Sequence, residues 1–264
     1  MRRLSLLCVA LVATLASGCA TTSQRTGYTA DQLKSLGEKA LLAHDTPTAL
    51  KFLSEAENRR PDDAAIEYDL ALAYSQRGFE ARALQHIKKA LKIKPDYPEA
   101  LNTLGYMYAT RGKFDLARAA FEKALNDPFY QTPQIAALNL GELYERRGDS
   151  RKALSYYKQA VKLDPQSAEA WYRIGRISEK AGNNDEARHA YETAVQDSPN
   201  MAEAYLRLGI MSYRAGHLKD AAGSFSEVER IAPDTDPADE AQRYLEKINN
   251  PLNPSKPLSV PRRS

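Results

Sequence analysis

The sequence predicts an all-α protein, an α-solenoid of stacked helix pairs with one further helix covering its last face. Two observations carry this prediction. A small residue that follows an aliphatic one recurs about every 34 residues, and an alanine recurs twelve residues after each of these small residues. A fixed period of this length is typical of repeat proteins, in which every unit buries its apolar face against its neighbours. Six such units are expected between residues 30 and 235.

The pair of an aliphatic and a small residue sets the register of the units. Successive pairs are 34 residues apart, except for one step of 36 residues. The pairs are Leu36-Gly37, Leu70-Ala71, Leu104-Gly105, Leu140-Gly141, Ile174-Gly175 and Leu208-Gly209. A 34-residue unit of two antiparallel helices is the tetratricopeptide repeat (TPR). The sequence therefore resembles a TPR array with repeats at 30–63, 64–97, 98–133, 134–167, 168–201 and 202–235.

Two further positions of each repeat indicate how its helices pack. The alanine at the twentieth place is Ala49, Ala83, Ala117, Ala153, Ala187 or Ala221. A larger residue stands at the twenty-fourth place: Leu53, Ile87, Phe121, Tyr157, Tyr191 or Phe225. The small residues are expected to let the two helices approach closely, and the larger residue is expected to fill the gap to the next repeat.

Glycine and proline mark the ends of the expected helices. Five repeats have a glycine between their two helices, where a positive φ angle suits a residue without a Cβ atom, and the first repeat has His44 there instead. The five are Gly78, Gly112, Gly148, Gly182 and Gly216. Five repeats also close with a proline, which cannot continue a helix because it has no N–H group: Pro61, Pro95, Pro165, Pro199 and Pro233.

The helical pattern continues for one element beyond the sixth repeat. Residues 236–249 carry an apolar stripe that includes Tyr244 and Leu245, with polar residues on the opposite side. A solenoid needs such a helix to cover its last apolar face, so this segment is expected to be a capping helix. The remaining residues, 250–264, are rich in proline and are expected to form a disordered tail.

The N-terminus has the features of a bacterial lipoprotein signal. Two arginines precede an apolar run of 13 residues, which as a helix is about 20 Å long and too short for a bilayer core of about 30 Å. Small residues then lead to Cys19 in a pattern that resembles a lipobox, although Leu15 stands one place earlier than is usual. A signal peptide is therefore expected at 1–18, and an acylated Cys19 at the start of a tether over 19–29. The alternative is an ordinary signal peptide with an incidental cysteine.

The residue after the cysteine bears on the membrane that holds the anchor. It is Ala20 rather than aspartate, and by resemblance to lipoprotein sorting this favours the outer membrane, with the protein facing the periplasm. Several acyl chains on one residue anchor a protein stably, whereas one chain alone is marginal.

Charge and motifs argue against several classes of function. The formal charge of +3 falls to +1 once the two arginines of the signal are removed, which disfavours a nucleic-acid binder that relies on bulk positive charge. The four histidines lie in different repeats without the spacing of metal ligands, and the sequence has no nucleophile or phosphate-loop motif. We therefore expect no enzymatic activity, no metal or other cofactor, and no small-molecule substrate.

The first helix of each repeat is expected to line the concave side of the stack. The positions that face the groove in TPR proteins give an apolar series here: Tyr68, Leu72, Tyr106, Leu138, Tyr172, Leu206, Ile210 and Tyr213. A charged series accompanies it: Glu142, Glu145, Arg146, Glu169, Arg176, Glu179, Lys180 and Arg214. Aromatic and aliphatic side chains at such positions favour binding of a segment from a protein partner. The alternative for each ring is that it packs against its neighbours.

Taken together, the lipobox, six consecutive repeats and the capping helix resemble the pilotin (PilF/PilW) family of type IV pilus biogenesis lipoproteins. A longer third repeat adds to the resemblance, because members of that family also have a linker with tyrosine and proline before a helix that begins Asn-x-Gly. Tyr130, Pro133, Asn139 and Gly141 match this pattern. The resemblance covers residues 19 to about 248.

A pilotin binds subunits of an outer-membrane secretin and allows the secretin ring to assemble. The resemblance therefore implies a secretin subunit as the protein partner and the outer membrane as the location. Two alternatives remain: a lipoprotein adaptor for another envelope machine, such as polysaccharide export or the control of peptidoglycan hydrolases, and an enzyme-associated or substrate-binding module.

Overall fold

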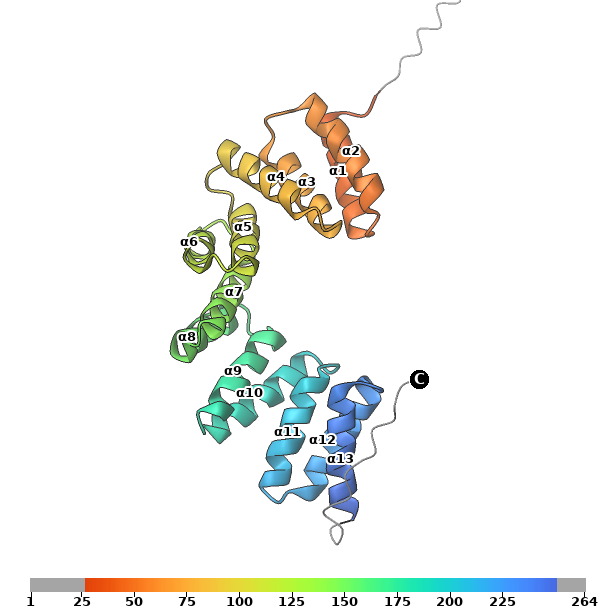
Figure 1. Ribbon diagram of the computed structural model, residues 1–264, viewed down its shortest axis with the longest axis vertical. Helices are drawn as coiled ribbons and strands as arrows, with labels where there is room; N and C mark the ends of the chain where they lie inside the picture. Colours follow the sequence, from red (N-terminus) through yellow and green to blue (C-terminus); the bar gives the residue numbers. More distant parts are fainter. Residues whose placement is uncertain (1–26, 251–264) are drawn as a thin grey trace, which may run out of the picture.

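The computed structural model describes residues 27–250 and confirms the all-α fold class. In this part of the chain, thirteen helices form six antiparallel pairs followed by a single helix (Figure 1). None of the described helices is long and apolar enough to cross a membrane. The predicted signal peptide (1–18), Cys19 with the tether up to residue 26, and residues 251–264 of the predicted tail lie outside the described residues.

Each repeat contributes two helices. The first helices are α1 (Ala30–Leu42), α3 (Ala64–Gln76), α5 (Pro98–Thr110), α7 (Pro133–Arg146), α9 (Ala168–Lys180) and α11 (Ala202–Arg214). The second helices are α2 (Thr46–Arg59), α4 (Glu80–Ile93), α6 (Phe114–Leu125), α8 (Ser150–Leu163), α10 (Asn184–Asp197) and α12 (Leu218–Ile231). The single last helix, α13 (Asp236–Asn249), coincides with the predicted capping helix.

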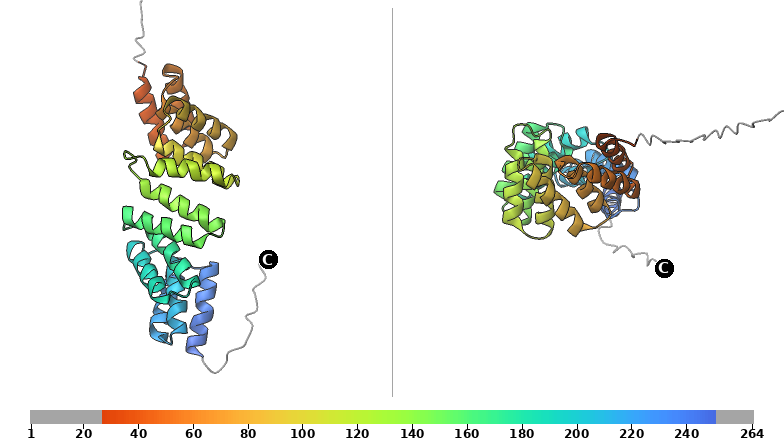
Figure 2. Two further views of the ribbon diagram at one scale, coloured as in Figure 1. Left: turned by 90° about the vertical axis from the view of Figure 1, so that its left-hand side faces the viewer. Right: turned by 90° about the horizontal axis from the view of Figure 1, so that it is seen from above.

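The helix pairs stack in chain order into an arc (Figure 1). In this view α5 and α7 lie on the inner side of the arc, and α6 and α8 lie on its outer side. From the side the stack is elongated, with the first repeat at one end and α13 at the other (Figure 2). Helices that pack closely are neighbours or next-but-one neighbours in the chain, so the core is a series of clusters along the stack.

Close packing inside each repeat occurs at the eighth place. A Cβ atom on Gly105 would lie 2.6 Å from the ring of Phe121, so the ring occupies the space that the missing side chain leaves. Phe121 also belongs to a core cluster with Leu140 and Leu143 of the next repeat. The predicted role of this residue in filling the gap between repeats is therefore confirmed, and the same ring also covers the glycine of its own repeat.

The turns within the repeats confirm the predicted role of glycine. Five glycines have φ angles between 70° and 81°, a region that is open to a residue without a Cβ atom. His44 takes the equivalent place in the first repeat with a φ of 56°. This left-handed conformation costs a residue with a side chain about 1–2 kcal/mol, so the first turn is strained where the other five are not.

The third repeat is longer because a loop, residues 126–132, separates α6 from α7. Tyr130 fixes this loop to the core, since its side chain is buried in a cluster with Leu101, Ala124 and Ala136. The N–H group of Phe129 donates a hydrogen bond to Oδ1 of Asp127 at 2.8 Å, a contact typical of a tight turn. A turn hydrogen bond and a buried ring thus fix the part of the loop from Asp127 to Tyr130.

Candidate protein-binding groove

The inner face of the arc carries three adjoining hollows that follow one another along the chain. The first lies between α5 and α7, the middle one between α7 and α9, and the third between α9 and α11. The first and the middle hollow share Glu142 and Arg146, and Arg176 of the third hollow is 3.7 Å from Glu145 of the middle one, so the three hollows adjoin. The first helices of repeats 3 to 6 therefore present a long shallow groove rather than an isolated pocket.

Accessibility divides the predicted apolar series into three groups. Tyr106 is 58% exposed and stands in the first hollow. Half-buried members are Tyr68, Leu72, Leu138, Tyr172 and Tyr213. Some of their rings pack against neighbours, because the centroid of Tyr68 is 5.2 Å from that of Tyr97 and the centroid of Tyr172 is 5.8 Å from that of Tyr191. Some side chains of this group thus pack against a neighbouring ring and still keep part of their surface accessible.

The prediction that Leu206 and Ile210 face solvent is wrong. Both side chains are buried in a cluster that includes Ala238 and Ala241 of α13. The capping helix packs against the first helix of repeat 6 as well as the second, and so it covers positions that stay open in the earlier repeats. The ring of Tyr213 meets that of Tyr244 at 5.1 Å, which closes this end of the groove.

A polar network joins repeat 4 to repeat 5 on the groove side. The hydroxyl of Tyr157 donates a hydrogen bond to Glu145 at 2.8 Å, and the guanidinium of Arg173 from the next repeat is 3.6 Å from the same carboxylate. Burial and the neighbouring carboxylate raise the pKa of the Tyr157 hydroxyl, so this group remains a donor. The network places one carboxylate between a buried ring and a cation of the following repeat.

The same network recurs one repeat later. Tyr191 donates to Glu179 at 3.0 Å, and Nε of Arg207 donates to the same carboxylate at 2.9 Å. Burial raises the pKa of the Tyr191 hydroxyl as well. These contacts were not predicted from the sequence, although tyrosine, glutamate and arginine each recur at an interval of 34 residues and could have indicated them.

The middle hollow has a balanced charge. Two carboxylates and two guanidinium groups line it: Glu142, Glu145, Arg146 and Arg173. Arg173 lies 3.3 Å from Glu142, so the opposite charges are paired within the protein. Burial raises the pKa of Glu142, but the carboxyl keeps a guanidinium partner that favours its charged form.

The third hollow, of about 640 Å³, has an excess of positive charge, and we call it the cationic hollow. Its principal lining residues are Tyr172, Arg176, Glu179, Lys180, Arg207 and Arg214. Four cations thus surround a single carboxylate, which is 10% exposed and already bonded to Arg207 and Tyr191. Within residues 27–250, Lys180 makes no ion pair.

Near the N-terminal end, one group of side chains has the spacing of metal ligands. Among the described residues, only the ligand atoms of Glu57, Glu67 and His86 come close enough together to hold an ion. The ammonium of Lys89 lies 2.7 Å from Glu57 and 2.5 Å from Glu67, and His86 is 2.7 Å from the other oxygen of Glu67. The lysine supplies the positive charge that a metal would bring, so this group is an ion-pair network between repeats.

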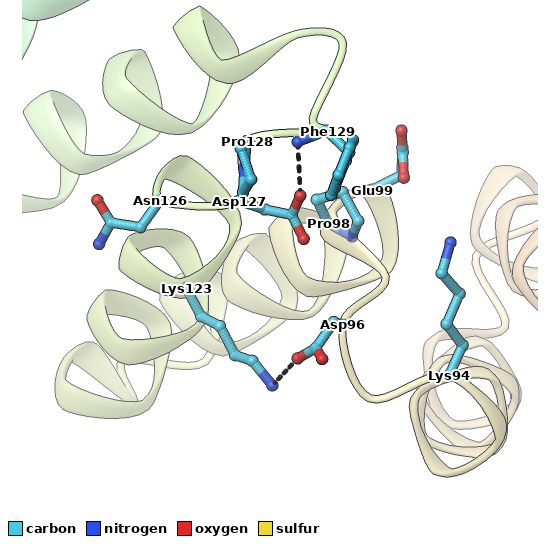
Figure 3. Close-up of a pocket in the computed structure, with 9 residues that line it drawn as sticks. All are labelled: Lys94, Asp96, Pro98, Glu99, Lys123, Asn126, Asp127, Pro128 and Phe129. Carbon is cyan, nitrogen blue, oxygen red and sulfur yellow. Dashed lines mark hydrogen bonds and ion pairs between the residues drawn. The ribbon is translucent and has the colours of Figure 1, made fainter.

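A second accessible feature lies at the edge of the stack, outside the groove. Phe129 is 82% exposed and lines a hollow of about 780 Å³ between the loop that follows α6 and the loop that precedes α5 (Figure 3). Lys123 bonds to Asp96 across this hollow at 2.9 Å. An exposed ring on a fixed turn is a typical anchor for a protein contact, so this edge is a second candidate surface.

Known proteins of the same architecture were found by comparison of sequence and structure. The tetratricopeptide repeat family matches residues 68–131, 138–183 and 179–235. The small glutamine-rich tetratricopeptide repeat-containing protein 2 of Mycosarcoma maydis is 32% identical over 100 residues, which are 38% of this chain. The chain matches 28% of the length of that relative.

Solved structures share the fold over a larger part of the chain. PilF of Pseudomonas aeruginosa has a TM-score of 0.74 at 20% identity and covers 81% of this chain and 96% of its own. PilW, described as a widely conserved type IV pilus biogenesis factor, has a TM-score of 0.70 at 23% identity and covers 81% of this chain and 98% of its own. The Cut9–Hcn1 hetero-tetramer of APC/C also matches, with a TM-score of 0.68 at 18% identity over 84% of this chain and 44% of its own.

Identities of this size show a shared fold and do not identify a partner. The repeat match is more specific, because it extends over most of repeats 2 to 6 and coincides with the helix pairs of the structure. The chain therefore belongs to the tetratricopeptide repeat family and is a protein-binding scaffold of that family.

Proposed function

We propose that this protein is a lipoprotein of the bacterial outer membrane that binds a secretin subunit and promotes assembly of the secretin ring in type IV pilus biogenesis. The observation that carries the proposal is the match in fold to PilF and PilW, which covers 81% of this chain and nearly the whole length of each of those two proteins. The lipobox-like sequence before Cys19 and the longer third repeat support it.

The architecture suits this role. α1 lies at one end of an elongated stack (Figure 2), and the proposed tether from an acylated Cys19 precedes it in the sequence. The groove opens on the inner face of repeats 3 to 6, away from that end, so a partner bound there stays clear of the attachment point. Anchoring and binding are thus assigned to separate parts of one stack.

The test of the proposal is the substitution Cys19→Ala. Without the acylated cysteine the protein loses its anchor, and secretin monomers are expected to accumulate away from the outer membrane. Immunoblots of secretin after membrane fractionation measure monomer, multimer and location together. Secretin multimers at the normal level in the outer membrane of this mutant would contradict the pilus role.

Affinity capture identifies the partner and the surface that it uses. Tyr106→Ala alters the most exposed ring of the groove, Phe129→Ala alters the loop edge, and Leu116→Ala is the matched control because Leu116 is half exposed on the outer helix α6. The proposal expects secretin to co-purify with the native protein and to be depleted by Tyr106→Ala but not by Leu116→Ala. Capture of polysaccharide-export or peptidoglycan-hydrolase components instead would show that the protein is an adaptor for one of those machines.

A further inference from the structure

Equivalent positions in repeats 4 and 5 carry opposite charges. The ninth place of the repeat is Glu142 in repeat 4 and Arg176 in repeat 5, and each residue lines the hollow next to its helix. The middle hollow consequently has as many carboxylates as guanidinium groups, whereas the cationic hollow has four cations around Glu179. Both repeats have the same arrangement of two helices, so the difference in charge lies in the side chains.

The single carboxylate of the cationic hollow is fully used by the protein itself. Glu179 accepts hydrogen bonds from Tyr191 and Arg207, and Arg214 is 3.4 Å away. Arg214 is nevertheless 64% exposed and keeps most of its guanidinium free for another partner. A cation whose carboxylate is shared with others retains donors that can bind an anion.

The remaining two cations are also accessible. Lys180 is exposed and has no ion pair within the described part of the chain. Arg176 is 3.7 Å from Glu145 of the preceding repeat, a long contact, and its guanidinium lies 5.9 Å from the ring centroid of Tyr172. Three cationic groups and one half-buried ring thus face the same hollow.

From this geometry we infer that the cationic hollow binds an acidic peptide segment of the partner protein, with carboxylates on Arg176, Lys180 and Arg214 and an apolar side chain against Tyr172. Guanidinium groups bind carboxylates through paired hydrogen bonds, and an aromatic ring beside them adds apolar contact. The inference rests on the proposed function only in taking the inner face of the arc as the surface that the partner uses.

Continuity with the rest of the groove favours a peptide over a small anion. The contact of Arg176 with Glu145 connects the cationic hollow to the middle hollow, and that hollow continues into the one that contains Tyr106. An extended chain can follow such a strip from neutral to positive surface, whereas a phosphate or a lipid headgroup would occupy only its end.

The experiment measures the fluorescence anisotropy of a labelled peptide with the full-length protein in a neutral detergent. The probe is the peptide Glu-Asp-Phe-Glu-Asp with a blocked N-terminus and an amidated C-terminus, and the comparison peptides, blocked in the same way, are its neutral analogue Gln-Asn-Phe-Gln-Asn and its basic analogue Lys-Lys-Phe-Lys-Lys. The acidic peptide is expected to bind at least about tenfold more tightly than either analogue, and its affinity is expected to fall as salt is raised from 50 to 300 mM, as for exposed charges.

The chain itself suggests the variants. Arg176→Glu gives the ninth place of repeat 5 the charge that it has in repeat 4. This variant is expected to lower the affinity for the acidic peptide by about tenfold or more. The double variant Lys180→Ala with Arg214→Ala removes two positive charges without adding a negative one, and it is also expected to lower the affinity for the acidic peptide. Arg151→Glu is the matched control, because Arg151 is exposed at the start of the outer helix α8 and changes the net charge equally. Circular dichroism of each variant establishes that the helices are intact.

Equal binding of the three peptides, or an equal loss with Arg151→Glu and Arg176→Glu, would overturn the inference. So would preferential binding of phosphatidylglycerol vesicles or of inorganic polyphosphate with no binding of the acidic peptide, since the site would then recognise phosphate. These outcomes are separate from the test of Cys19. Acidic-peptide binding together with normal secretin assembly in the Cys19→Ala mutant would leave the inference standing and remove the pilus role.

Discussion

A glycine at the eighth place of a repeat is required by the ring that lies over it. In repeat 5, a Cβ atom on Gly175 would be 2.6 Å from the ring of Tyr191, which is fully buried and held by its hydrogen bond to Glu179. Carbon atoms do not approach so closely, so either the ring or the helix must move if a methyl group is added. The ring cannot swing away without breaking a polar network that connects repeats 5 and 6.

Gly175→Ala is therefore expected to lower the free energy of unfolding by about 1–3 kcal/mol through overpacking. Gly223→Ala is the matched control, because Gly223 lies in the interior of α12 with open space where its Cβ atom would be. There the gain in helix propensity should raise stability by about 0.5–1 kcal/mol. Urea denaturation of the two variants checks the opposite signs, and equal effects would contradict this account of the crossing.

Asp69 is a buried acid whose charge weakens the fold. Burial is the main reason that its pKa rises from the ordinary value of 3.8 to about 6, with Lys34 at 3.5 Å as a partial counterweight. The folded chain thus holds this proton more tightly than the unfolded chain does. By linkage, stability is greatest below pH 4 as far as this group is concerned and falls as the pH rises from about 4 to 6.

Asp69→Asn removes this ionisation while keeping the shape of the side chain. The variant is expected to be more stable than the native protein at pH 7.5, by at most about 3 kcal/mol, and the difference should shrink towards zero at pH 4. Urea midpoints measured across this range test the prediction. A variant that is less stable at pH 7.5 would show that the ion pair with Lys34 outweighs the cost of burial.

At the level of elements, α13 closes the stack because its aromatic residue fits between two others. Tyr244 stacks on Phe225 with ring centroids 5.0 Å apart and meets Tyr213 edge-on. These contacts join the capping helix to both helices of the last repeat, α11 and α12. They also explain why the inner face ends at repeat 6, since the same helix buries Leu206 and Ile210.

Tyr244→Ala is expected to destabilise the protein by about 2–4 kcal/mol and to expose the apolar surface of repeat 6. Arg243→Ala is the control, because the adjacent residue is exposed and its loss should stay within about 0.5 kcal/mol. Thermal melts give the two stabilities, and binding of a hydrophobic dye reports the exposed surface. A Tyr244→Ala protein as stable as Arg243→Ala would mean that α13 does not depend on this contact.

For the whole molecule, stability is expected to be local, because each described helix packs only against helices that are near it in the chain. Each core cluster joins one repeat to the next or, at the end of the stack, repeat 6 to α13, and the described helices do not pack around a common centre. The stability of such a stack is approximately the sum of the repeats and their interfaces. Damage at one end should consequently leave the other end folded.

Trp171, the single tryptophan of the chain, allows this to be measured. A Cβ atom on Gly37 would lie 2.5 Å from the side chain of Leu53, so Gly37→Ala is expected to unfold the first repeat early and to lower the helical signal. Trp171 in repeat 5 should keep its native denaturation midpoint in that variant. In Gly175→Ala, by contrast, the tryptophan transition should shift, and a shift in both variants would show that the stack unfolds as one unit.

Sequence periodicity predicted the parts of the structure that repeat, because they depend on contacts within 34 residues. The crossing at Gly105 and Phe121 and the turns at the five glycines are of this kind. The burial of Ile210 was not predictable in the same way, because the helix that covers it follows the last repeat and is not a further copy of the pattern. The 34-residue recurrence of tyrosine, glutamate and arginine could have indicated the contacts around Glu179, but the geometry of the bond to Arg207 depends on how two repeats are rotated against each other.

The bond of Tyr191 and Arg207 to Glu179, with its counterpart one repeat earlier, has a consequence for how such a chain can lengthen. An in-frame duplication of residues 168–201 would place an arginine equivalent to Arg173 after Glu179, and the tyrosine would already be present in the copy. The new interface between repeats would then already contain the tyrosine, the glutamate and the arginine of this hydrogen-bond network. An ancestral gene could therefore have gained whole repeats without further substitutions at the interface.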